Sequence, residues 1–428
     1  MEKKFTWKKR YNLVVIMFLA GLLLMFDRAV ISVALPVMEK DLNLTPVSLG
    51  IIMGSFSIAY ALMQIPGGLL ADKFGSRVIG AISIVFWSIF TFLTGTAASL
   101  AALVGIRFAF GLGEGSFVPA QYKALAVWFP KKERGRATAI TNISMMIGGA
   151  LTAIIAAGLI GKFGWRSVFY SLFVPGLILA VLFWIFVKDS PAKDKKLPAE
   201  ELAEINADDV AVETAQKIKI ADILKYPVVW QLYIVYFASA MVSFGVNSWM
   251  SVYVVDGLKG TLMQFGLASI VVSIGGLIGQ MVGGFIADKS RATQKYQMFI
   301  SWIIAAVFLF LGVSTNSLPV AVIFFTVETC FFFLAVSAFF ARMSTALPRK
   351  AMGLGSGIIQ TSGYIAGAIS PILIGFIVQA TGGSYKTAFF VMCALLLVAG
   401  FLALTVKKSS FEEEHATEPN VDKGQPAK

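Results

Sequence analysis

Two ionisable residues, Arg107 and Glu114, stand in the apolar segment RFAFGLGEGSFVPA. They are seven positions apart, close to two turns of an α-helix, so both side chains point to the same side, about 10 Å apart along the axis. Charged groups inside a bilayer are costly and normally face a bundle interior or a wet cavity. The pair predicts a site that binds an anion through the guanidinium and carries a proton on the carboxyl. The alternative is a structural ion pair that locks this helix to a neighbour.

A second pair of charges, Asp27 and Arg28, lies in the first apolar segment. Adjacent helical residues point about 100° apart, so the two cannot both face a cavity squarely. We expect Arg28 to reach the anion and Asp27 to titrate or to position its neighbours. The alternative is that Asp27 merely neutralises Arg28 or Arg107, because buried charges need partners.

Glu328, in TVETCFFFLAV, is a third candidate proton-coupling acid. It could take up a proton or contact a cationic part of the substrate. The alternative is a neutral acid hydrogen-bonded within the protein interior.

Uncharged candidates for the substrate site are Tyr60, Gln64, Asn247, Gln360 and Tyr364. A phenol can donate a hydrogen bond to a carboxylate while its ring packs against apolar neighbours. The alternative for each is an ordinary packing or interfacial role, which is common for aromatic residues in membrane proteins.

The elements that carry these residues are apolar and long. The chain has 428 residues, of which 57% are hydrophobic and 14% are charged, whereas soluble proteins have about a quarter charged residues. Segments of about 20 apolar residues, each long enough to cross a bilayer, recur along the sequence. We predict an all-α membrane protein with twelve transmembrane helices near 12–36, 47–70, 78–97, 100–125, 138–160, 167–187, 228–255, 263–287, 297–315, 319–345, 351–379 and 386–406.

The net charge of +12 is distributed unevenly. Most of the Lys and Arg residues lie at the N-terminus, in alternate loops and in the C-terminal tail. This asymmetry follows the positive-inside rule, so we expect both termini in the cytoplasm. No basic face on a soluble fold is visible, which argues against nucleic-acid binding. The first apolar run lacks a small-residue cleavage site, and we interpret it as a retained helix rather than a signal peptide.

The polar stretch 188–226 divides the chain. We predict an N-terminal six-helix bundle at 1–187, a cytoplasmic central loop at 188–226, a C-terminal six-helix bundle at 227–408 and a disordered tail at 409–428. The two cysteines, Cys330 and Cys393, fall in apolar helices, and His415 is the only histidine. These residues form no metal-ligand pattern, no nucleotide motif is visible, and we expect no cofactor.

The two halves carry related loops. GLLADKFGSR spans 68–77 and GFIADKSR spans 284–291, which places Asp72 and Asp288 at equivalent positions of a repeat. Transporters built from repeats have their site at the repeat interface. Asp72 could stabilise the outward-facing state by lying against the positive end of a helix from the other half. The alternative is that these charges only mark topology. The predicted gating set is Gly68, Asp72, Lys73, Gly75, Arg77, Asp288, Arg134 and Arg136.

These loops and the six-plus-six layout resemble the major facilitator superfamily. Three segments, FDRAVISVALPVMEKDL, SFSIAYALMQIPGGLLADKFG and RFAFGLGEGSFVPAQYKALAVWFPKKERGRAT, are similar more narrowly to the anion:cation symporter family. The resemblance implies two pseudo-symmetric bundles and proton-coupled uptake of organic anions. It maps the site onto Asp27, Arg28, Tyr60, Arg107 and Glu114. An Asn pair, frequent in helix 11 of that family, is replaced here by Gln360 and Tyr364.

The predicted function is inward transport of a small organic anion, such as a sugar acid, aromatic carboxylate or sulfonate, with protons by alternating access. Anion exchange is the first alternative. Drug:proton antiport is disfavoured by the two arginines, and a transporter-like sensor by the lack of an output module. The expected partners are the anion, protons and the lipid bilayer, and the expected form is a monomer in a bacterial inner membrane.

Overall fold

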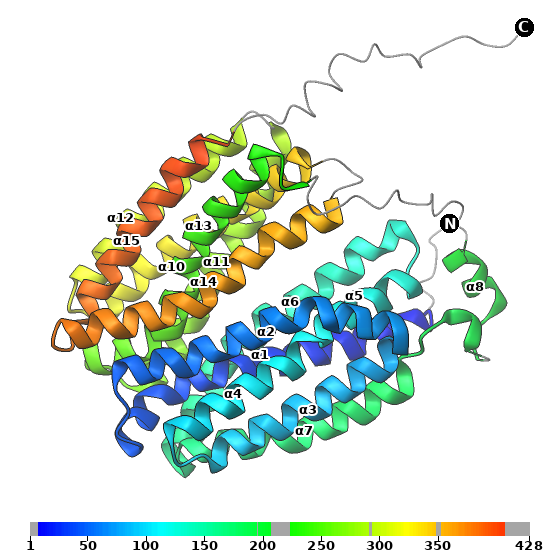
Figure 1. Cartoon of the computed structure of the whole chain (residues 1–428), viewed down its shortest axis with the longest axis horizontal. Helices are drawn as coiled ribbons and strands as arrows, with labels where there is room; N and C mark the ends of the chain where they lie inside the picture. The colour runs from blue at the N-terminus through cyan, green and yellow to red at the C-terminus, as the bar shows by residue number, and fades with distance from the viewer. Residues whose placement is uncertain (1–6, 195, 207–222, 291–292, 348–351, 407–428) are drawn as a thin grey trace, which may run out of the picture.

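The computed structural model describes residues 7–194, 196–206, 223–290, 293–347 and 352–406 (Figure 1). In these ranges the chain is helical, and twelve helices are long and apolar enough to cross a membrane. The predicted all-α membrane fold with twelve spans is therefore confirmed. The predicted disordered tail at 409–428 and the middle of the central loop lie outside the described residues.

The N-terminal half contributes seven α-helices to six spans, because the fourth span is split between α4 and α5. Two short elements follow, and the C-terminal half then supplies the remaining spans. In order, the elements are α1 (Arg10–Asp41), α2 (Pro46–Phe74), α3 (Ser76–Thr96), α4 (Leu100–Gly115), α5 (Phe117–Trp128), α6 (Lys131–Phe163), α7 (Trp165–Phe186), η1 (Pro191–Lys193), α8 (Ala199–Asn206), α10 (Pro227–Val252), η2 (Tyr253–Gly257), α11 (Leu262–Lys289), α12 (Gln294–Ser314), α13 (Leu318–Ala346), α14 (Met352–Ala380) and α15 (Tyr385–Leu404).

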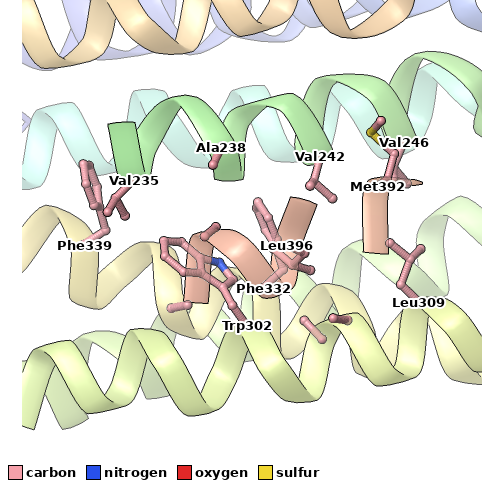
Figure 2. Packing of buried hydrophobic residues seen from close by; sticks show 14 of the residues in the cluster. Val235, Ala238, Val242, Val246, Trp302, Leu309, Phe332, Phe339, Met392 and Leu396 are labelled. Atoms are coloured by element: carbon pink, nitrogen blue, oxygen red, sulfur yellow. The ribbon is translucent and has the colours of Figure 1, made fainter. Parts of the chain in front are cut away.

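The helices pack as two bundles. In the first, α1 lies on α6 and α7, α2 on α4, and α3 on α7; in the second, α13 lies on α11 and α12, and α15 on α10 and α12. Figure 2 shows the interior of the second bundle, where α10, α12, α13 and α15 meet through apolar side chains such as Trp302, Phe339 and Leu396. Interlocking buried side chains make each bundle a unit that can move as a body.

The bundles meet along α2 with α14 and α6 with α11 (Figure 1). Small residues allow this approach: a methyl group at Gly50 of α2 would lie 2.5 Å from the carbonyl oxygen of Pro371, and one at Gly266 of α11 would lie 2.9 Å from that of Ala153. Lys40 and Asp256 form an ion pair of 3.0 Å at the same end. The halves are therefore closed against each other at the end that carries the α1–α2 turn.

At the opposite end, α8 of the central loop is fastened to the first bundle. Arg10, fully buried, donates to Glu133 of α6 at 3.0 and 3.1 Å and to Glu204 of α8 at 2.9 Å. The backbone N–H groups of Lys9 and Arg10 donate to the Glu201 carboxylate, each at 2.9 Å. An acid at a helix start satisfies free amides and interacts favourably with the helix dipole. Helix α8 is therefore attached to the N-terminal bundle.

Arg10→Ala is expected to release α8, because it removes the cation shared by Glu133 and Glu204. Hydrogen–deuterium exchange of 199–206 should then accelerate, while Lys132→Ala, an exposed change on the same face, should leave the exchange unchanged. Hydrogen bonds from Lys8 and Arg10 lower the pKa of Glu204. Its contribution to docking is therefore present above the ordinary carboxyl pKa and disappears as the pH falls through the lowered value. Equal protection of α8 in Arg10→Ala and the native chain would contradict this attachment.

Candidate functional site

The fourth span carries two of the predicted charges and is broken at Ser116. The Ser116 hydroxyl donates to the carbonyl of Gly113 at 2.9 Å and lies 2.8 Å from that of Ser83, which holds the break inside the bundle. Methyl groups at Gly111 and Gly115 would come within 2.6 and 2.8 Å of carbonyl oxygens of α2. Small residues commonly allow such close packing between membrane helices. The sequence did not predict the break.

Glu114 is paired with Arg28 of α1. The Arg28 Nε donates to Glu114 Oε1 at 2.8 Å, and a terminal guanidinium nitrogen contacts the same oxygen. Glu114 is completely buried, and its second oxygen has no partner in the described part of the chain. An ion pair between helices was the alternative considered for this carboxyl, and the structure shows one. It joins α1 to α4 and leaves one carboxylate oxygen free to accept a proton.

Arg107 has no such partner. It is 2% exposed, and its guanidinium carbon lies 4.5 Å from the ring centroid of Phe110 and 5.1 Å from that of Phe56. Its Nε has no hydrogen-bond acceptor, and no ion pair to it is found among the described residues. Aromatic faces compensate a buried cation only in part. Arg107 is therefore a buried cation that lacks a counter-ion.

Arg28 and Arg107 border a cavity of about 530 Å³ between the two bundles. This volume is in the range of small-molecule sites. Both bundles contribute to the lining: Phe56 and Ser57 come from α2, whereas Asn247 of α10 and Glu328 of α13 come from the other half. The structure thus brings together four of the residues predicted from sequence, namely Arg28, Arg107, Asn247 and Glu328.

Asp27 lies on the other side of α1 from the cavity. It is 1% exposed and accepts a hydrogen bond of 3.1 Å from the indole N–H of Trp87 on α3. Its second oxygen has no partner among the residues described. The prediction that only one of the adjacent residues Asp27 and Arg28 can face the cavity is confirmed.

Four other predicted contacts, Tyr60, Gln64, Gln360 and Tyr364, are not part of this lining. The rings of Tyr60 and Tyr364 lie against each other with centroids 5.0 Å apart, and the Arg28 guanidinium lies 4.8 Å from the Tyr60 ring. Tyr60 and Tyr364 meet where α2 packs on α14, and the assignment of the four residues as substrate contacts stays a prediction. In the present conformation, the Tyr60 ring packs against the Arg28 guanidinium.

Phe56 is a lining residue that sequence reasoning missed. Its ring centroid lies 5.2 Å from the guanidinium carbon of Arg28 and 5.1 Å from that of Arg107. The spacing in SFSIAY could have indicated this residue. Phe56 stands four residues before Tyr60, and residues four apart on a helix are neighbours.

The predicted gating residues have contacts within their own half. Asp72 pairs with Lys123 of α5 at 2.9 Å, and Lys123 also donates to the carbonyl of Ala71. Arg134 and Arg136, also in the predicted gating set, form no ion pair with Asp72 in the described structure: Arg134 donates to the Phe129 carbonyl, and Arg136 is exposed. The sequence gives no direct sign of which basic residue lies beside Asp72.

The rest of the motif shapes the α2–α3 turn. Gly75 has φ of 90°, a conformation that favours glycine, and a methyl group there would meet Asp189 at 2.4 Å. The backbone N–H of Arg77 donates to Asp189 at 2.8 Å, and its side chain donates to the Trp184 carbonyl at 2.7 Å. Three more members of the set make no ion pair within the described ranges: Gly68, which has no side chain, and the exposed Lys73 and Asp288.

Within the described residues, no group of His, Cys, Asp and Glu side chains is arranged to hold a metal ion. The polar groups that border the cavity are the guanidinium groups of Arg28 and Arg107, the Glu328 carboxyl, and small hydroxyl and amide groups. Such a set can bind an anion and move protons.

The family model described as Major Facilitator Superfamily matches residues 17–371. A probable sulfoacetate transporter of Cupriavidus necator is 30% identical over 410 residues, covering 93% of this chain and 94% of that protein. A probable galactarate/D-glucarate transporter of Bacillus subtilis is 29% identical over 439 residues, covering 95% and 96%. These relatives confirm the resemblance to the anion:cation symporters.

The fold is also that of solved transporters. The structure of a bacterial homologue of the human lysosomal transporter Spinster, in an inward-facing and occupied conformation, superposes with a TM-score of 0.78 at 18% identity and covers 96% of this chain and 99% of that one. The family match, the relatives and the twelve spans lead to one conclusion. The chain is a multi-pass membrane protein that belongs to the Major Facilitator Superfamily of transporters.

Proposed function

We propose that this protein carries a small organic anion into the cell together with protons, by alternating access. The observation that carries the proposal is Arg107, a buried cation that borders the cavity and lacks a counter-ion in the described structure. A buried unpaired charge is costly, and an anionic ligand would remove that cost. The names of the relatives, which include transporters of sulfoacetate and of galactarate or D-glucarate, agree with an organic anion.

The orientation follows from charge. The positive-inside rule places the N-terminus and the central loop on the cytoplasmic side. The end at which Lys40 and Asp256 form an ion pair then faces outward. The present conformation is then inward-facing. The units that rock against each other are the bundles at 1–187 and 227–408, in a monomer of a bacterial inner membrane.

Coupling arises from competition for Arg28. In the ion pair, Glu114 holds this guanidinium. A proton on Glu114 weakens the pair and frees Arg28 to join Arg107 on the incoming anion. Release of the anion inside allows Glu114 to lose its proton and recapture Arg28. Asp27, with one unsatisfied oxygen in the same bundle, is the second candidate for a proton.

The same geometry would serve an anion exchanger, in which a second anion rather than a proton resets Arg28. A drug:proton antiporter fits less well, because two guanidinium groups border the cavity. A sensor would require an output element, and the described part of the central loop holds only two short helical elements, η1 and α8, of which α8 is fastened to the first bundle.

The test is uptake by the purified chain in vesicles, with sulfoacetate, D-glucarate, a hexuronate and benzoate as labelled probes. An inward pH gradient should drive accumulation of at least one probe, and a protonophore should abolish it. Accumulation that ignores the pH gradient but depends on an anion loaded inside would favour exchange. Uptake of cationic dyes with no anion transport would contradict the proposal.

Asp72→Ala is expected to slow transport severalfold while leaving anion binding intact, because Asp72 lies at the cytoplasmic end, far along α2 from Phe56. Loss of this carboxylate should favour conformations open to the cytoplasm. Labelling of cysteines introduced on the cytoplasmic walls would measure this shift, with Lys132→Ala, an exposed change outside the gating set, as the control. Unchanged labelling would reduce Asp72 to a marker of topology.

A further inference from the structure

The proposed transport cycle leaves one acid of the cavity unused. Glu328 lies on α13, in the bundle opposite Arg107, and borders the same cavity at 6% exposure. Its described hydrogen bond comes from the Thr329 hydroxyl to Oε2 at 2.9 Å. No hydrogen bond to the other oxygen is found among the described residues. No Lys or Arg forms an ion pair with Glu328 in the described ranges.

The surroundings of Glu328 are aromatic rather than cationic. Phe325 and Phe332 stand about one turn before and after it on α13, and both border the cavity. The α11 part of the cavity lining holds Ser269 and Ser273, whose hydroxyls donate to their own helix backbone at 2.9 and 2.7 Å. Aromatic faces and a carboxylate together suit an ammonium group.

Among the described residues, the cavity has one charged group without an ion pair on each of its two walls. Glu114 neutralises Arg28, so Arg107 remains unmatched on the N-terminal wall. Glu328 remains unmatched on the C-terminal wall. A simple anion would pair with Arg107 alone and leave the acid without a counter-ion, whereas a ligand that carries both charges offers a partner to each of these two residues of the same cavity.

We propose that the transported substrate is a small zwitterion, whose carboxylate or sulfonate lies at Arg107 and whose ammonium group lies at Glu328. This inference rests on the proposed function, because it uses the same anion site. It adds Glu328 as the residue that selects ammonium-bearing substrates over anions of equal size that lack the ammonium.

Matched probes test the selection. Taurine has an ammonium group where isethionate has a hydroxyl. Glycine betaine has a trimethylammonium group where 3,3-dimethylbutanoate has a tert-butyl group. Titration calorimetry on the purified full chain should show that at least one ammonium member binds about tenfold tighter than its partner. Glu328→Gln should weaken that member by about tenfold and change the affinity of its partner without the ammonium by less than about twofold. Glu328→Asp, which keeps the charge, should retain the preference.

Three results would overturn the proposal. The first is equal affinity for the two members of both pairs, or no binding of either zwitterion at millimolar concentration. The second is an equal loss of both members in Glu328→Gln, which would make Glu328 structural. The third is a preference that survives Glu328→Gln while proton-driven accumulation is lost, which would make Glu328 a proton site.

Arg107→Ala separates this inference from the proposed function. If Arg107→Ala loses all bound anions but the native chain shows no ammonium preference, only the zwitterion inference fails. If Arg107→Ala binds the probes as the native chain does, the anion site itself is misplaced, and both fail.

Discussion

Arg107→Ala is expected to abolish concentrative uptake and to weaken binding of the transported anion roughly 10- to 100-fold, the loss that follows when a charged hydrogen-bond partner is removed. The reason is that Arg107 is the buried cation of the cavity with no counter-ion in the described structure. Arg107→Lys should recover only part of the affinity, because an ammonium cannot reproduce the planar fork of guanidinium on an oxyanion.

Protein stability provides the control for this prediction. Arg107→Ala leaves no carboxylate of the described residues without its partner, so the purified variant should unfold at or above the native temperature. Arg28→Ala, in contrast, leaves Glu114 buried and unpaired and should unfold earlier. Thermal unfolding in detergent, followed by calorimetric binding, measures both effects. Near-native anion affinity in Arg107→Ala would overturn the site assignment.

Glu114→Gln is expected to separate binding from coupling. The amide imitates a permanently protonated carboxyl, so Arg28 stays free to meet the anion and binding persists. The carrier can no longer release its proton, and accumulation driven by a pH gradient should therefore fall to the level of empty vesicles. Counterflow exchange of the same anion, which needs no net proton movement, should continue.

Glu200→Gln is the matched control, since Glu200 is an exposed acid of α8 outside the spans. It should accumulate and exchange the anion as the native chain does. Should Glu114→Gln still concentrate the anion under a pH gradient, the coupling role passes to Asp27 or Glu328, or the carrier is not a symporter.

The sequence predicts the spans well because a single quantity, the length of an apolar run, decides them. It also predicts Arg28, Arg107 and Glu328 as cavity residues, because an ionisable group in a transmembrane helix normally faces the bundle interior or a water-filled cavity. The prediction that Asp27 and Arg28 diverge follows from helical geometry alone.

Which residues contact one another is harder to predict. The helical period fixes the face on which Glu114 lies but not the helix that meets it, so the pairing with Arg28, 86 positions away, is not predictable from spacing. Tyr60 and Tyr364, both expected in the site, meet each other where α2 packs on α14. The partner of Asp72, Lys123, depends equally on the packing of α5 against α2.

The central claim, that anion and proton move together through the cavity at Arg107, is tested most directly by proton movement without an imposed proton gradient. Vesicles holding the native chain and an internal pH dye are given an inward gradient of the transported anion alone. We expect rapid internal acidification that Arg107→Ala and Glu114→Gln both abolish. Anion entry at the native rate with no change of internal pH would contradict proton symport.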